Sequence, residues 1–160
     1  KMAVNLQEQG KESALSVVND LVANLGVLYV KLHQYHWYVQ GPEFFRLHEK
    51  FEELYNEATA LSDTFAERLI AKGEKPYSTL KEYLDNASIS EKPYTQKISA
   101  EDMVRNLIED YETIGNLVLR GIELAGEEND SVTEDILIGY KESIDKTLWM
   151  LQAFLGKDVK

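Results

Sequence analysis

The chain has 160 residues, of which 44% are hydrophobic and 28% are charged, a balance typical of one folded domain over residues 1–160. It contains no cysteine, which excludes disulfide bonds, thiolate metal sites and cysteine nucleophiles. The start of the chain lacks the apolar run of a signal peptide, and no later segment reaches the roughly 20 apolar residues of a membrane span. We therefore expect a cytoplasmic protein that makes no contact with a membrane.

The net charge is strongly negative. The chain carries 28 acidic and 17 basic residues, which gives a formal charge of −11. Such a chain repels nucleic acid and anionic membranes at long range and attracts cations. Acidic proteins are common, so the charge favours a metal-binding function without establishing it.

Apolar residues recur at three- and four-residue steps in four segments, as in amphipathic helices. The first two predicted helices span about 11–39 and 43–72. The third begins near Ser99, and the fourth carries an apolar stripe over 137–155. No segment alternates polar and apolar residues in the manner of a strand, so the predicted fold class is all-α.

Glycines, prolines and caps mark the ends of these helices. A Gly-Pro pair at 41–42 separates the first two, and proline suits a first helical turn. Gly73 and Gly156 follow the second and fourth helices, where a left-handed cap is expected. Ser131 and Glu134 form a candidate capping box for the fourth helix.

The connections predict the topology. The links between the first two and the last two helices are short, which implies antiparallel neighbours, whereas about 25 residues over 73–98 join the second helix to the third. A connection of that length crosses the whole bundle, and its TLKEYLDNA segment predicts a short helix. We expect a ferritin-like four-helix bundle with a short extra helix in the crossover, although long crossovers also occur in unrelated bundles.

Two pairs of metal-ligand residue types lie on the second predicted helix. His48 and Glu52 are four residues apart, as are Asp63 and Glu67, so each pair shares a helix face. All four fall roughly 80–180° from the apolar stripe, on one flank. No Glu-x-x-His motif occurs in the sequence, which disfavours a di-iron centre inside the bundle.

The order of these pairs is nearly palindromic. Glu52 and Asp63 are separated by about 16 Å of helix, too far to serve one ion. If two copies of the helix pack antiparallel across a twofold axis, residue 48 lies opposite 67 and residue 52 opposite 63. Two equivalent four-ligand sites then form, each shared between subunits. An isolated pair at this spacing is more often a solvated helix face than a site.

One further histidine is a candidate ligand, and two tryptophans are candidate interface residues. His36 lies in the first helix's apolar stripe, where a histidine is usually a hydrogen-bonded core residue, and nearby ligands favour coordination instead. Trp37 and Trp149 lie outside the apolar stripes of their helices. Each is either an interface residue or a partly exposed tryptophan at the edge of the core. Histidine with carboxylates suits iron, manganese or zinc better than calcium.

The sequence resembles a known family through KLHQYHWYVQGPEFFRLHEKFEELYNE and DTFAERLIAKG. Both segments are similar to the signature of the Dps proteins, the mini-ferritins named for DNA binding in starved cells, and the similarity continues through STLKEYLDNAS, GIELA and SIDKTLWMLQAFLG. The resemblance implies a dodecamer with a ferroxidase site at each dimer interface. It also implies iron as the bound metal, oxidation of Fe²⁺ preferentially by hydrogen peroxide over dioxygen, and storage of a ferric core.

By the same resemblance, His36, His48 and Glu52 come from one subunit, and Asp63 and Glu67 come from its twofold mate. The chain departs from the family at Glu52, where aspartate is common.

The resemblance also implies acidic pores that admit iron near the start of the fourth helix. The candidates are Asp130, Glu134 and Asp135, with Glu127 and Glu128 nearby. The alternative is an ordinary solvated helix start, where acids interact favourably with the helix dipole.

Two other functions remain open: a DNA-compacting protein with secondary iron chemistry, and a structural bundle with a degenerate site. The side chains of residues 1–13 carry no net charge, and the four residues after Gly156 carry one positive charge. DNA binding without base readout depends on lysines and arginines that neutralise phosphates, so we expect no stable complex with DNA near neutral pH at about 0.15 M salt. The intact ligand set argues against the degenerate bundle.

Overall fold

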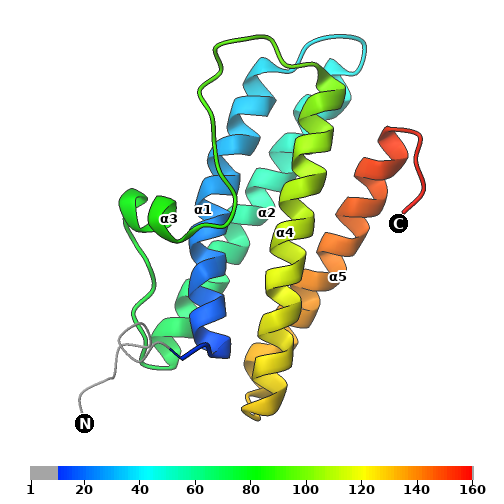
Figure 1. Cartoon of the computed structure of the whole chain (residues 1–160). Coiled ribbons are helices and arrows are strands. Elements are labelled where there is room, and N and C mark those ends of the chain that lie inside the picture. The colour runs from blue at the N-terminus through cyan, green and yellow to red at the C-terminus, as the bar shows by residue number, and fades with distance from the viewer. Residues whose placement is uncertain (1–10, 160) are drawn as a thin grey trace.

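The computed structural model describes residues 11–159, which form five helices and no strand (Figure 1). The four long helices are α1 (Ala14–Tyr38), α2 (Phe44–Ala71), α4 (Ala100–Glu127) and α5 (Ser131–Phe154). The short helix α3 (Leu80–Asn86) lies in the crossover between α2 and α4. The prediction of an all-α bundle with a short extra helix at this place is confirmed.

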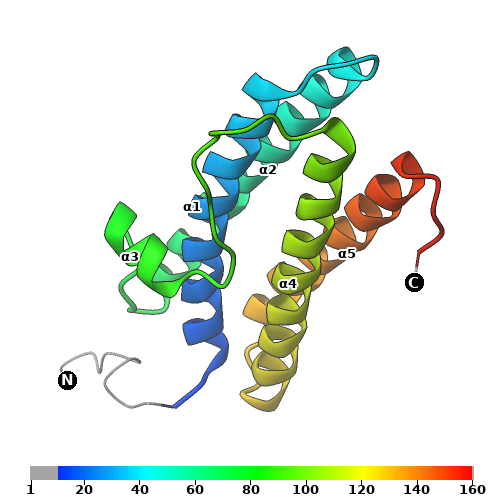
Figure 2. The same ribbon diagram turned by 45° about the horizontal axis from the view of Figure 1, so that its top comes forward.

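The topology follows from the lengths of the connections. α1 packs against α2 and α4 packs against α5, so the bundle consists of two antiparallel hairpins. The connection after α2 returns along the whole length of the bundle before α4 begins, as Figures 1 and 2 show. α2 and α4 therefore run in the same direction, which is the ferritin-like arrangement predicted from the long crossover.

Helix α1 is the central element of the core. It packs against α2, α3 and α4, and leucines such as Leu21, Leu25 and Leu32 are fully buried. By length and composition alone α1 is apolar enough to cross a membrane. A core helix meets the same test, and the burial of these leucines among the other helices accounts for its apolar character.

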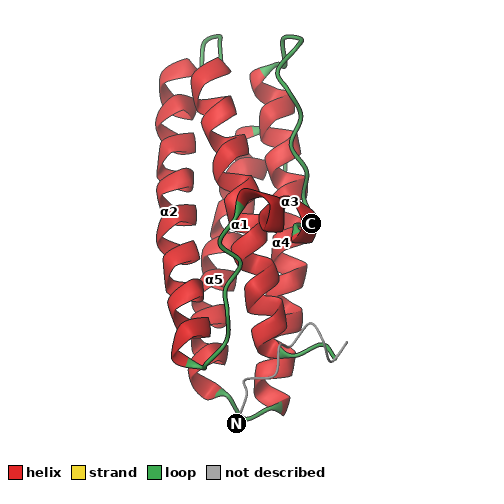
Figure 3. Ribbon diagram, turned by 90° about the vertical axis from the view of Figure 1, so that its left-hand side faces the viewer, coloured by secondary structure: helices red, strands yellow, loops and turns green. Residues whose placement is uncertain are grey.

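Side chains of α1 hold the crossover against the bundle, beside which it runs in Figure 3. The fully buried Asn24 accepts hydrogen bonds from the backbone N–H groups of Ser88 and Ile89 at 2.8 and 3.2 Å. The ring of Tyr83 from α3 lies directly over Gly26, so close that a Cβ at residue 26 would be 2.6 Å from Tyr83 Cδ2. A small residue at this position therefore allows α3 to pack onto α1.

The predicted glycine caps have the expected conformation, and one cap differs from the prediction. Gly73 and Gly156 have φ angles of 82° and 74°, in the left-handed region. The capping box of Ser131 with Glu134 was wrong, because α5 is capped one residue earlier. The Asp130 carboxylate accepts a hydrogen bond from the Thr133 N–H at 3.2 Å. Aspartate is as good an N-cap as serine, so sequence preference alone did not separate the two positions.

Candidate metal centre

The centre of the site is a pair of histidines held by reciprocal hydrogen bonds between α1 and α2. His36 Nδ1 lies 2.7 Å from the backbone oxygen of His48, and His48 Nδ1 lies 2.7 Å from the backbone oxygen of His36. The two rings stack with centroids 3.7 Å apart and planes inclined by 13°. The antiparallel contact of α1 with α2 thus positions both rings through main-chain atoms.

These bonds determine which ring nitrogen is available to a metal. A carbonyl oxygen can only accept, so each Nδ1 must carry the proton and donate it. In the neutral imidazole, Nε2 then holds the free lone pair, and an Nδ1–H bound to a carbonyl is the usual partner of a histidine that coordinates metal through Nε2. His36 and His48 can therefore each offer one nitrogen atom, Nε2, to a metal ion.

Glu52 lies one turn beyond His48 on α2 and is also held. The hydroxyl of Tyr55 donates a hydrogen bond to Glu52 Oε1 at 3.2 Å. The Tyr55 ring is edge-on to His36, with centroids 5.4 Å apart. Desolvation and the bond to Glu52 raise the pKa of the Tyr55 phenol, so it remains a donor at neutral pH. The structure thus brings His36 and His48 into contact, and the side chain of Tyr55 contacts both His36 and Glu52.

Asp63 and Glu67 lie elsewhere on the same helix. Both are exposed, and the helical rise places them about 16 Å or more along α2 from Glu52. Asp63 borders a groove of about 550 Å³ whose other walls include Tyr29 and Tyr83. Within the part of the chain that the structure describes, no three histidine or acidic side chains gather closely enough to hold one metal ion.

The two tryptophans are largely exposed on the single chain. Trp37 is 68% exposed and Trp149 is 55% exposed. The Trp37 ring lies near His33, with centroids 5.3 Å apart. Such large exposed aromatic surfaces are more favourable when another protein surface covers them.

The acidic residues at the start of α5 differ in burial and in the hydrogen bonds and ion pairs that their carboxylates make. Burial alone would raise the pKa of Asp130, but hydrogen bonds from Thr133 and Arg68 and the nearby Lys72 ammonium lower it below its usual value. Its carboxylate is therefore engaged in capping α5 and in pairing with Arg68 at 3.0 Å. Glu134 is partly buried and Asp135 is exposed.

The two acids just before α5 differ in the same way. Glu127 is exposed, whereas Glu128 accepts a hydrogen bond from the Ala14 N–H at 3.0 Å. Glu128 therefore helps to cap α1.

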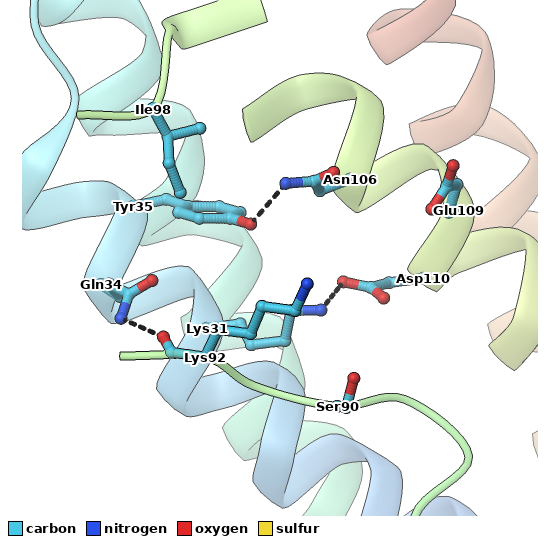
Figure 4. Close-up of a pocket in the computed structure, with 9 residues that line it drawn as sticks. All are labelled: Lys31, Gln34, Tyr35, Ser90, Lys92, Ile98, Asn106, Glu109 and Asp110. Atoms are coloured by element: carbon cyan, nitrogen blue, oxygen red, sulfur yellow. Dashed lines mark hydrogen bonds and ion pairs between the residues drawn. The ribbon is translucent and has the colours of Figure 1, made fainter. Parts of the chain in front are cut away.

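A second polar cluster lies on the α4 side of α1, around a cavity of about 200 Å³ (Figure 4). Lys31 Nζ of α1 lies 2.6 Å from Asp110 Oδ2 of α4, and both side chains are nearly buried. Beside this ion pair, Asn106 donates a hydrogen bond to the Tyr35 hydroxyl at 3.1 Å. Burial raises the pKa of Asp110, although Lys31 opposes the shift.

Sequence reasoning missed two residues of the site, Tyr55 and His33. Tyr55 is three residues after Glu52, a spacing that places both on one helix face and could have indicated their contact. His33 stacks on Tyr55 with centroids 3.8 Å apart, and its Nδ1 donates to the Tyr29 carbonyl oxygen at 2.9 Å. No spacing rule would have indicated the contact between His33 and Tyr55, because it depends on the register of α1 against α2.

Comparison with known proteins agrees with this architecture. The family model for the ferritin-like domain matches residues 15–159. The DNA protection during starvation protein of Listeria monocytogenes is 49% identical over 140 residues, which cover 88% of this chain and 90% of that protein. General stress protein 20U of Bacillus subtilis is 47% identical over 145 residues, with 91% and 99% coverage.

Solved structures of related proteins also superpose closely on this chain. The X-ray structure of Dps from Listeria monocytogenes superposes with a TM-score of 0.91 at 47% identity, covering 92% of this chain and 96% of that one. Dps from Listeria innocua soaked with cobalt gives a TM-score of 0.90 at 47% identity, with 92% and 95% coverage. The chain belongs to the Dps family of ferritin-like proteins.

Proposed function

We propose that this protein is a ferroxidase and iron-storage protein that limits oxidative damage. The observation that carries the proposal is the reciprocal hydrogen bonding of His36 and His48. It leaves the Nε2 lone pair of each ring free, with His48 one turn before Glu52 on α2. Mixed nitrogen and oxygen ligands of this kind suit Fe²⁺.

The other ligands come from a twofold-related copy of the chain. Three ligands on one subunit leave the metal's shell incomplete, and Asp63 and Glu67 are exposed on the same helix at the palindromic positions. An antiparallel pairing of two α2 helices joins each trio to the partner's two carboxylates and forms two equivalent sites. The exposed tryptophans and the groove beside Asp63 offer surface for such an interface.

The chemistry needs only positioned iron and an oxidant. Two Fe²⁺ ions each give up one electron, hydrogen peroxide accepts both, its O–O bond breaks, and two hydroxide ions form. Delivery of both electrons to one peroxide avoids the free hydroxyl radical that a single electron would release. The carboxylates favour Fe³⁺ over Fe²⁺ because their negative charge stabilises the more highly charged ion. Dioxygen is the alternative oxidant.

Storage requires a closed shell. We propose a dodecamer in the cytoplasm that holds the ferric product in its cavity and admits iron through acidic pores. Because Asp130 is paired with Arg68, we expect Glu134 and Asp135 to contribute most of the negative charge of the pore.

A mixing experiment tests the shared site. His48→Ala and Asp63→Ala each remove one ligand from every site, so each variant alone should lose rapid peroxide-driven oxidation of Fe²⁺. When equal amounts are dissociated and reassembled together, about half of the dimers are mixed, and about a quarter of all sites receive a complete ligand set. The amplitude of rapid Fe²⁺ oxidation, followed by ultraviolet absorbance, should return to about a quarter of the wild-type value.

Light scattering of the mixture should give roughly twelve times the subunit mass of 18.3 kDa. Reassembled His48→Ala alone is the control. Absence of any recovery in mixed particles of the correct mass would show that the ligands are not shared between subunits.

DNA compaction is the second candidate, because several relatives are named DNA protection during starvation proteins. The charge of −11 on each subunit opposes contact with phosphates. We expect no stable complex with duplex DNA at about 0.15 M salt, where the Debye length of about 8 Å leaves surface charge effective at contact. A retarded band in a mobility-shift assay without divalent metal would contradict this expectation.

A further inference from the structure

The side chain of Glu52 is less firmly held than those of the two histidines of the site. The ring of each histidine is held by a main-chain oxygen, whereas Glu52 is exposed and has a long, flexible side chain. A carboxylate that samples several rotamers loses conformational entropy when it binds a metal, and the loss weakens binding. The contact that restrains Glu52 is the 3.2 Å hydrogen bond from Tyr55.

Tyr55 is itself held through a series of contacts that ends at the main chain of α1. Its ring stacks on His33 with centroids 3.8 Å apart and planes inclined by 21°. His33 is fixed by its own bond from Nδ1 to the Tyr29 carbonyl oxygen at 2.9 Å. The His36 ring also belongs to this aromatic cluster and lies perpendicular to the Tyr55 ring, with centroids 5.4 Å apart. The hydroxyl of Tyr55 is thus a rigidly placed donor.

We propose that Tyr55 is a positioning residue that holds the Glu52 carboxylate in its metal-binding orientation, an inference that rests on the proposed metal centre. The hydroxyl occupies Oε1 and leaves Oε2 for the ion. Hydrogen bonds of this kind to a ligating carboxylate orient it, and their loss typically weakens metal binding by 10- to 100-fold.

The length of the residue 52 side chain makes the inference specific to this chain. Aspartate is shorter than glutamate by one methylene, or about 1.5 Å. From the same helix position its carboxylate would end well beyond hydrogen-bonding distance of the Tyr55 hydroxyl. Tyr55 therefore matters when residue 52 is glutamate and loses this role when it is aspartate.

A double-mutant cycle tests this dependence. The Co²⁺ affinity of the assembled protein is measured by titration of the visible cobalt bands for wild type, Tyr55→Phe, Glu52→Asp and the double variant. Phenylalanine keeps the stacked ring, so the fold is preserved. We expect Tyr55→Phe to weaken Co²⁺ binding about 10-fold beside Glu52 and to have almost no effect beside Asp at 52.

Tyr38→Phe is the control, since Tyr38 is also a partly exposed tyrosine but its ring stacks on Tyr94 and not on the cluster around Tyr55. It should bind Co²⁺ as the wild type does. An equal loss from Tyr55→Phe in both backgrounds, or no loss in either, would overturn the positioning role.

His48→Ala separates this failure from a failure of the proposed function. If His48→Ala abolishes Co²⁺ binding and Tyr55→Phe has no effect, only the role of Tyr55 is wrong. If His48→Ala leaves the cobalt affinity unchanged, the metal centre itself is wrong.

Discussion

Two polar clusters lie on different faces of α1, and they differ in what their internal contacts leave free. Toward α2, each ring of the His36–His48 pair uses only Nδ1 in its hydrogen bond, so two lone pairs remain for an ion. Toward α4, Lys31 and Asp110 neutralise each other in an ion pair of 2.6 Å. The first cluster can offer ligand atoms, whereas the second holds two helices together.

This difference predicts opposite responses to substitution. Removing the proposed ligands His48, Glu52, Asp63 or Glu67 should abolish metal binding and cost little stability, because these side chains are partly or fully exposed. Removing a charge on the α4 side should cost stability and leave metal binding intact, because it leaves a buried charge without its partner.

The largest effect is expected for His48→Ala combined with Asp63→Ala. In the proposed site, one substitution removes a nitrogen ligand and the other removes the carboxylate from the partner subunit, so the rate of peroxide-driven Fe²⁺ oxidation should fall by more than roughly 100-fold. The helical circular dichroism spectrum should be unchanged. Loss of the hydrogen bond from His48 to His36 should cost only about 1 kcal/mol of unfolding free energy.

Glu49→Ala combined with Thr64→Ala is the matched control, since both residues are exposed neighbours of the substituted positions on α2. It should oxidise iron at the wild-type rate. Rapid oxidation that survives in the His48 and Asp63 double variant would place the chemistry elsewhere in the molecule.

Periodicity and spacing predicted much of this arrangement. The apolar stripes predicted the four long helices, and the length of the crossover predicted that the second and third of them run in the same direction. Both rest on local rules, because one face of each helix must be buried and a connection must reach its destination. The candidate pairs on α2 also came from a local rule, the shared face of residues four apart.

The bonds between helices could not be predicted in this way. The reciprocal contact of His36 with His48 and the pairing of Lys31 with Asp110 depend on the axial register of one helix against another, which packing determines. The cap of α5 shows the same limit over a short distance, because Asp130 and Ser131 are both suitable caps. In the fold Asp130 is the N-cap of α5, and its carboxylate also forms an ion pair with Arg68.

The second prediction concerns Lys31→Met, on the α4 side. The change leaves the nearly buried Asp110 carboxylate without its cation, and breaking a buried pair in this way costs about 3 kcal/mol of unfolding free energy. Burial already raises the pKa of Asp110 above its unfolded value, and loss of Lys31 raises it further. Chemical denaturation should therefore show the largest deficit near pH 7.5 and a smaller one near pH 4, where protonation removes the unpaired charge.

Lys92→Met is the matched control, because Lys92 borders the same cavity but is exposed. It should leave stability nearly unchanged, and both variants should keep the wild-type affinity for Co²⁺. If Lys31→Met instead weakened cobalt binding without affecting stability, the contrast between the two sides of α1 would be wrong.

The smallest effect is expected at Asp20, a carboxylate of α1 that belongs to neither cluster. Burial and the nearby charge of Glu12 raise the pKa of Asp20 from 3.8 to about 6. In the folded protein the carboxylate therefore holds its proton more tightly than in the unfolded chain. The folded state has no disadvantage well below pH 3.8, where the carboxyl is protonated in both the folded and the unfolded chain. It loses stability as the pH rises from about 4 to 6, and the penalty persists above that range.

Asp20→Asn removes this penalty, so it should raise the melting temperature at pH 7.5 and leave it unchanged near pH 3.5. Because the side chain is partly exposed, solvent screening reduces the effect, and we expect a rise of about 2 °C. Asp158→Asn, at an exposed position near the end of the described chain, should change the melting temperature at neither pH. A lower melting temperature for Asp20→Asn at pH 7.5 would mean that the ionised carboxylate has a stabilising partner. In that case Asp20 would resemble Asp110 on the other side of the comparison, as a charge whose pairing stabilises the bundle.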